Sequence, residues 1–150
     1  MFKVNRHISI LIGAIFFFTG IVKLFYLDSF SKEVAMYSDL YLFPWVINNS
    51  FLVAILVCST EILLGILSFS KTTETQASVL LLIVISFFLY LTFRNYLNTI
   101  EGIGIDSCGC IGELLSLSAN VSFYKNVILW ILIAFNTYRL CYYNRKKNMA

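Results

Sequence analysis

Long apolar runs separated by short polar stretches dominate this chain. A helix needs roughly 20 apolar residues to cross a hydrocarbon core of about 30 Å. Four runs are long enough, covering about 8–27, 45–69, 77–97 and 121–142. A backbone in lipid has to satisfy its own hydrogen bonds, which favours a helix for each run. The pattern therefore predicts an all-α, integral membrane four-helix bundle in which residues 1–150 form a single domain.

The first connection, about 28–43, is expected to form a short interfacial helix after span one. Its apolar side chains recur at helical spacing, at Phe30, Val34, Tyr37 and Tyr41, with Lys32, Glu33 and Asp39 on other faces. This amphipathic pattern is typical of a helix that lies in the membrane surface, with a membrane-hugging connector as its simplest role. Pro44 is expected to open span two, because the first turn of a helix does not use the missing N–H.

Composition excludes an ordinary small soluble domain. Apolar residues make up 59% of the chain and charged residues 13%, whereas soluble domains have roughly 45–50% and 25%. The net charge of +3 is modest, and no basic patch interleaved with aromatic residues indicates a nucleic-acid partner. The lipid bilayer is the expected environment.

The positions of the basic residues predict the orientation, because Lys and Arg favour the cytoplasmic side. Seven of the 11 fall on one side: Lys3, Arg6, Lys71, Arg139, Arg145, Lys146 and Lys147. Three fall on the other (Lys32, Arg94, Lys125), and Lys23 lies within span one. We therefore expect a multi-pass protein of a bacterial inner or plasma membrane with both termini cytoplasmic and the third connection outside.

That third connection, about 98–120, carries the candidate chemistry. Cys108 and Cys110 flank Gly109, and Gly112 follows. A disulfide closing so small a ring is strained, Gly109 relieves part of the strain, and strained exposed disulfides tend to be catalytic or regulatory. A nearby cation, from Lys23, Arg94 or Lys125, would favour the reactive thiolate.

Two other readings of the thiol pair remain open. The pair could be inert. It could also bind a metal, but a structural zinc site needs four ligands, and the predicted spans place Cys58, Cys141 and His7 too far away. We therefore predict no metal.

Lys23 lies within span one and Glu61 within span two, where a charge costs several kcal/mol unless it is paired or hydrated. Lys23 is close enough to the outer end for its ammonium group to snorkel to the surface. Glu61 lies ~24 Å of helix rise beyond Trp45, so these boundaries do not favour a direct pair with Lys23. Glu61 is expected to be protonated or hydrogen-bonded, for proton handling or for orienting helices. Three glycines in the spans allow close helix approach: Gly13, Gly20 and Gly65.

Several short motifs together resemble the MauE branch of the DoxX-like membrane proteins. They are Gly20-Ile21-Val22-Lys23-Leu24, Glu61-Ile62-Leu63-Leu64-Gly65, Cys108-Gly109-Cys110-Ile111-Gly112 and Lys125-Asn126. The C-x-C-x-G loop is the specific part. The family pattern usually has Phe where this chain has Ile111 and Arg where it has Lys125, conservative changes that leave the thiol pair intact.

The resemblance implies a four-helix membrane protein of extracytoplasmic thiol–disulfide redox, with thioredoxin-like partners or, as in methylamine dehydrogenase maturation, a disulfide-rich substrate. Our hypothesis is a membrane thiol–disulfide oxidoreductase that cycles Cys108 and Cys110. Lys23, Glu61, Arg94, Gly109, Gly112, Lys125 and Asn126 are its supporting residues, and a quinone held near Lys23 and Arg94 is one conceivable electron carrier. The alternatives are a non-catalytic assembly subunit for a redox partner and a small proton-coupled transporter that uses Glu61.

Overall fold

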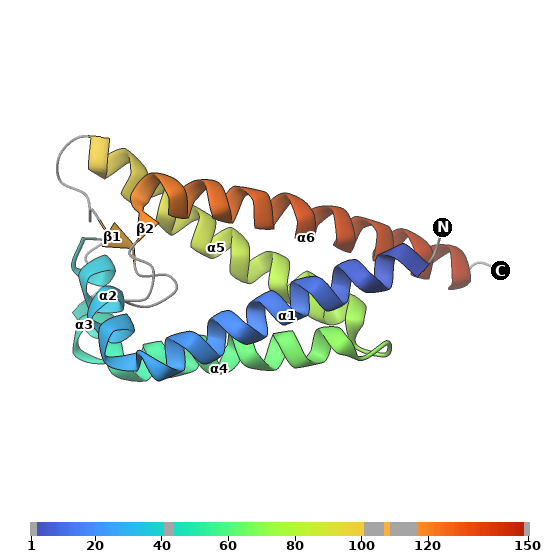
Figure 1. The fold of residues 1–150 in the computed structure, drawn as a ribbon, viewed down its shortest axis with the longest axis horizontal. Helices are drawn as coiled ribbons and strands as arrows, with labels where there is room; N and C mark the ends of the chain where they lie inside the picture. Colours follow the sequence, from blue (N-terminus) through green and yellow to red (C-terminus); the bar gives the residue numbers. More distant parts are fainter. Residues whose placement is uncertain (1–2, 41–43, 101–106, 109–116, 149–150) are drawn as a thin grey trace.

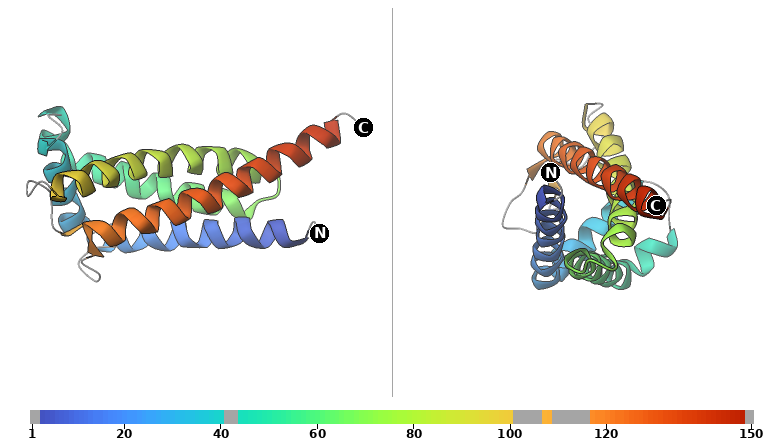
Figure 2. Two further views of the ribbon diagram at one scale, coloured as in Figure 1. Left: turned by 90° about the horizontal axis from the view of Figure 1, so that it is seen from above. Right: turned by 90° about the vertical axis from the view of Figure 1, so that its right-hand side faces the viewer.

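Four long helices run along the molecule in the computed structural model, which describes residues 3–40, 44–100, 107–108 and 117–148. They are α1 (Lys3–Phe25), α4 (Ser50–Phe69), α5 (Glu74–Ile100) and α6 (Ala119–Asn148). The end-on view in Figure 2 shows them grouped around a common axis. Two shorter helices, α2 (Leu27–Leu40) and α3 (Pro44–Asn48), lie at one end, which we call the α2 end, and both termini lie at the other, the terminal end (Figure 1). The predicted all-α class is confirmed.

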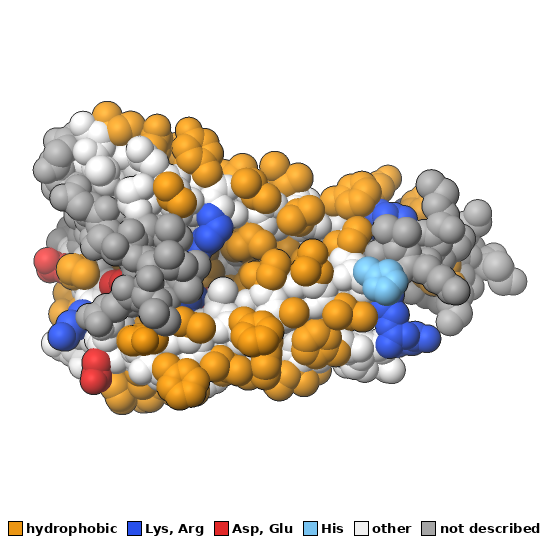
Figure 3. All heavy atoms as spheres, viewed as in Figure 1, with side chains coloured by type: hydrophobic (Ala, Val, Ile, Leu, Met, Phe, Trp, Pro, Cys, Tyr) orange, Lys and Arg blue, Asp and Glu red, His pale blue; other side chains and the backbone are white. Residues whose placement is uncertain are grey.

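Three of the long helices are long and apolar enough to cross a membrane, within the part of the chain that the structure describes. The qualifying stretches are Arg6–Phe25, Ser50–Leu67 and Glu74–Ile100, with mean hydropathies of 2.3, 2.3 and 2.2. On the face shown in Figure 3, hydrophobic side chains spread along the bundle between its two ends. These features indicate a multi-pass membrane protein.

Glycines bring α1 and α4 into close contact. A Cβ atom added at Gly65 would lie 2.8 Å from the carbonyl oxygen of Gly13 and 2.8 Å from the backbone nitrogen of Phe17. At Gly20, an added Cβ would lie 2.8 Å from Cγ1 of Ile62. The two backbones can approach this closely only because these positions lack side chains. The prediction that Gly13, Gly20 and Gly65 allow close approach is confirmed.

The second predicted span begins later than expected, which corrects the boundary at Trp45. Pro44 opens the separate five-residue helix α3, the chain leaves helical geometry at Asn49 (φ −119°, ψ 23°), and α4 begins at Ser50. The side-chain amide of Asn49 donates a hydrogen bond to the carbonyl oxygen of Trp45 at 2.9 Å. Asn favours such local bonds to the backbone over helix continuation.

The predicted interfacial helix is present as α2, and it also contributes to the core. Tyr26 alone separates α2 from α1. Phe30 of α2 is buried against Ala54 and Cys58 of α4. Because α1 ends at Phe25, α2 covers the first turns of α4 at this end of the bundle. α2 is therefore more than a surface connector.

The interior is arranged in three layers along the bundle. An apolar layer in the middle consists of Ile12, Phe16, Leu64, Leu81, Ile85 and Ile133. Buried polar residues lie on both sides of it. Toward the α2 end they include Lys23, Glu61, Thr92, Asn95, Ser122 and Asn126, and toward the terminal end Ser9, Ser78, Asn136 and Thr137.

A small antiparallel ladder lies within the third connection, between α5 and α6. β1 (Ser107–Cys108) pairs with β2 (Leu117–Ser118), so that Cys108 lies opposite Leu117. The strand β2 leads directly into α6. The ladder therefore fixes the backbone of Cys108 beside the start of α6.

Candidate functional site

A buried ion pair connects α1 and α4 near the α2 end. The ammonium nitrogen Nζ of Lys23 lies 2.5 Å from Oε1 of Glu61, and the two residues are 5% and 2% exposed. The expectations that Lys23 snorkels and that the two residues do not pair were both wrong. Gly20, one turn before Lys23, lets α1 approach so closely that an added Cβ would lie 3.2 Å from Cβ of Glu61. The pair follows from this close approach and from the late start of α4.

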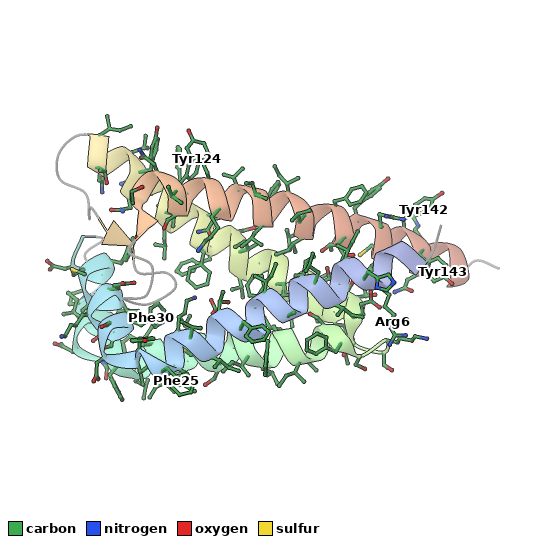
Figure 4. The ribbon with its side chains drawn as sticks, viewed as in Figure 1. Arg6, Phe25, Phe30, Tyr124, Tyr142 and Tyr143 are labelled. Atoms are coloured by element: carbon green, nitrogen blue, oxygen red, sulfur yellow. The ribbon has the colours of Figure 1, made fainter. Side chains whose placement is uncertain are left out.

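Two aromatic rings complete the surroundings of the Lys23 ammonium group. Its Nζ lies 5.2 Å from the ring centroid of Phe30 and 5.0 Å from that of Phe88. Figure 4 labels Phe30 near the junction of α1 and α2. Ring faces attract cations most strongly where water is excluded. Lys23 therefore links α1 to α2, α4 and α5 through one carboxylate and two rings.

A cavity of about 40 Å³ lies beside the ion pair, between α1 and α6. Its polar lining consists of Lys23 and Thr19 from α1, Glu61 from α4, and Lys125 and Asn126 from α6. The structure thus brings together four residues that the sequence analysis named as supporting residues. They come from three helices that are far apart in the sequence.

The other predicted site residues lie elsewhere or outside the described residues. Arg94 is exposed on α5 and does not line the cavity. Cys108 is described as part of β1, whereas Gly109, Cys110 and Gly112 lie outside the described residues, and so does the predicted disulfide.

The cavity does not fit a quinone ring. A cavity of about 150 Å³ is the size known to hold benzene, whereas this one measures about 40 Å³. We therefore derive no electron-transfer step through a quinone at Lys23. Among the residues that the structure describes, no group of three or more His, Cys, Asp or Glu side chains gathers as metal ligands.

Phe88 and Thr92 also belong to this site, although the sequence did not predict them. The side-chain amide of Asn126 donates a hydrogen bond to Oγ1 of Thr92 at 3.3 Å, joining α6 to α5. A usable signal was present, because Thr92 and Asn95 on α5, and Ser122 and Asn126 on α6, are spaced three or four residues apart. That spacing places each pair on one helix face.

Comparison with known proteins identifies a family. No curated protein and no solved structure matches the chain. The family model described as "Methylamine utilisation protein MauE" matches residues 1–139. The match includes the ion pair, the cavity and the Cys-Gly-Cys segment. The chain therefore belongs to the MauE family.

Proposed function

We propose that this protein is a membrane thiol–disulfide redox protein. Cys108 and Cys110 exchange a disulfide with an extracytoplasmic thioredoxin-like protein or with a maturing, disulfide-containing substrate. The observation that carries the proposal is the β1–β2 ladder, which places the backbone of Cys108 next to the start of α6. This is also the half of the bundle that contains the charged cavity.

The start of α6 offers an electrostatic environment that favours a thiolate. A helix N-terminus carries a partial positive charge and lowers the pKa of a nearby cysteine. Leu117, the partner of Cys108 in the ladder, lies two residues before α6 begins at Ala119. Lys125 adds a full positive charge within the first turns of the same helix. Both features support a reactive sulfur at this end.

The exchange needs no metal or bound cofactor. A thiolate of the Cys108–Cys110 pair attacks the disulfide of the partner, and a mixed disulfide forms as one sulfur of the partner leaves. The second cysteine then attacks the mixed disulfide and releases the partner as a dithiol, so that two electrons have passed to the partner. The reaction runs in reverse when the partner arrives reduced, and the two reduction potentials decide the direction.

The proposal requires α6 to cross the membrane as a fourth span, which places both termini on one side. Exposed tyrosines mark both ends of α6, Tyr124 near the α2 end and Tyr142 near the terminal end (Figure 4). Their separation of ~27 Å along the helix is close to the thickness of a hydrocarbon core. Tyr is enriched at both membrane interfaces. With the basic termini cytoplasmic, Cys108 faces the side where disulfides persist.

The family description extends the proposal to a biological setting. A protein needed for methylamine utilisation that carries several disulfides is the expected substrate, because each of its bonds requires an oxidant. This chain would pass two electrons from each dithiol of that substrate, through the Cys108–Cys110 pair, to the disulfide of an oxidised thioredoxin-like partner.

Thiol trapping in intact cells tests the proposed function. Of the single variants Cys108→Ser and Cys110→Ser, the one that lacks the resolving thiol is expected to accumulate a mixed disulfide with a partner, whereas the one that lacks the attacking thiol is expected to form none. Alkylation before and after reductant, followed by non-reducing electrophoresis, detects the adduct. Cys141→Ser is the matched control, because Cys141 is an exposed thiol at the terminal end. It is expected to leave the redox state of the pair unchanged.

Two results would contradict the redox function. One is a Cys108–Cys110 pair that stays in a single redox state under all growth conditions. The other is full biological activity of the Cys108→Ser/Cys110→Ser double variant, which would support the non-catalytic assembly subunit instead.

A further inference from the structure

One oxygen of Glu61 is buried without a visible hydrogen-bond donor. Oε1 accepts the bond from Lys23, whereas Oε2 has no partner among the residues that the structure describes. Glu61 is only 2% exposed. Buried polar atoms are nearly always hydrogen-bonded, and an unmet carboxylate oxygen is costly. Some donor is therefore expected at Oε2.

The neighbouring cavity has the size and lining for water. A water molecule needs roughly 10–15 Å³ of such space and two to four polar partners. The cavity of about 40 Å³ therefore has room for about three waters, and Glu61, Thr19, Lys125 and Asn126 line it. Water can donate to the carboxylate and accept from the ammonium groups, as this mixed lining requires.

The cavity is closed toward the terminal end. The middle apolar layer lies directly beyond it, and Phe16 and Ile85 belong to both the layer and the cavity wall. On the far side of the apolar layer, the buried polar side chains form hydrogen bonds with one another. Asn136 donates to Ser9 at 3.0 Å and to Ser78 at 3.3 Å, and the hydroxyls of Ser78 and Thr137 lie 2.7 Å apart.

We infer that the cavity between α1 and α6 is an ordered-water site that hydrates Glu61 and opens only toward the α2 end. The site connects Glu61 with solvent on one side of the membrane, so Glu61 does not serve a continuous path across it. This inference goes beyond the thiol exchange and holds whether or not Cys108 and Cys110 react. It argues against a continuously open proton path through Glu61.

Substituted-cysteine accessibility tests the site. Thr19→Cys is placed in a background in which Cys58 is replaced by Ala and Cys108, Cys110 and Cys141 by Ser. A small charged methanethiosulfonate is applied to sealed vesicles from each side. Phe18→Cys is the matched control, because Phe18 is the neighbouring residue and is exposed on the bundle surface. Ser78→Cys is the control beyond the apolar layer.

Thr19→Cys is expected to react from the α2 side at least about tenfold faster than either control, because only a hydrated thiol ionises readily. Reaction no faster than that of Phe18→Cys would overturn the inference. Equal reaction of Thr19→Cys from both sides would overturn its one-sidedness.

A second measurement avoids the cysteine background. In the wild-type protein in micelles, magnetisation transfer from water should reach the side-chain amide of Asn126 but not that of Asn136, whose amide is fully engaged with Ser9 and Ser78. The Asn126→Ser variant assigns the signal. Absence of transfer to Asn126 would contradict the water site even if the cysteine variants failed to fold.

Discussion

At the scale of single residues, the Lys23–Glu61 pair is the feature whose cost most needs explaining. A charge inside the membrane is expensive unless it is paired, and one oxygen of Glu61 accepts directly from Lys23. The rings of Phe30 and Phe88 contribute further to the stabilisation of the ammonium group. The cost of burying the two charges is offset because side chains of four helices, α1, α2, α4 and α5, take part in these contacts. The stability of the bundle should therefore respond sharply to either charge.

Substitutions at the ion pair test this coupling. Lys23→Met and Glu61→Gln are each expected to lower the free energy of unfolding by about 3–5 kcal/mol, because each leaves the other charge buried and unpaired. The double variant should lose much less than the sum of the two. Unfolding in mixed micelles, analysed as a double-mutant cycle, gives the coupling energy. Strict additivity would show that the pair contributes no coupling.

Phe88 and Phe87 form a matched comparison for the cation–π contact. Phe88→Leu is expected to lower stability by about 1–2 kcal/mol, because a desolvated ring face near Lys23 is lost. Phe87 is the adjacent residue but is exposed on the bundle surface. Phe87→Leu should therefore change stability much less in the same unfolding assay. Equal effects of the two substitutions would mean that general packing, and not the ammonium group, determines the loss.

At the scale of the helices, two features shape the site. The first is the glycine contact between α1 and α4, which sets their separation and places Lys23 within reach of Glu61. The second is α2, which turns back at Tyr26 and lays Phe30 over the first turns of α4. Both act on the ion pair without being charged themselves.

Gly65→Ala tests the close contact. An added methyl group would lie 2.8 Å from backbone atoms of Gly13 and Phe17, which have little freedom to move. Overpacking of this kind typically costs about 1–3 kcal/mol, and the displaced α1 should weaken the Lys23–Glu61 pair as well. Ile66→Ala is the control, since Ile66 is the next residue and is half exposed. A Gly65→Ala protein as stable as the Ile66→Ala protein would contradict the tight contact.

At the scale of the whole molecule, the polar residues of α6 lower its mean hydropathy, although several of them lie inside the bundle. Its polar residues Ser122, Asn126 and Asn136 are buried inside, whereas its outer surface carries large apolar residues such as Ile131 and Phe135. An average over all faces mixes the two. In the proposed fourth crossing only this outer face would meet the lipid, which is consistent with α6 spanning the membrane despite its buried polar residues.

Labelling from each side of the membrane tests the four crossings. In the same cysteine-free background, Asp39→Cys should react with an impermeant maleimide from outside, and Lys71→Cys and Arg145→Cys from the cytoplasm. All three positions are exposed. Reaction of Arg145→Cys from outside would mean that α6 does not cross, and the Cys108 end would then need a new assignment.

The local properties of this chain were readable from its residues. Apolar runs long enough to span a bilayer, the amphipathic spacing of 28–40 and the glycines of α1 and α4 are all features of neighbouring positions. Because backbone N–H and C=O groups in lipid must form hydrogen bonds within their own segment, such runs are expected to be helical. The thiol pair was visible for the same reason, since both cysteines lie within one short motif.

The site itself was decided by contacts between segments that are far apart in sequence. Whether Lys23 reaches Glu61 depends on where α4 begins, how closely Gly20 lets α1 approach and which rings surround the ammonium group. Because the chain leaves helical geometry at Asn49, α4 begins at Ser50 and not near Trp45. Glu61 therefore lies closer to the start of its helix than the sequence predicted, and the expected separation of Lys23 and Glu61 was too large. Linear patterns record the apolar length of each helix, but relative heights and rotations arise only when the helices pack together.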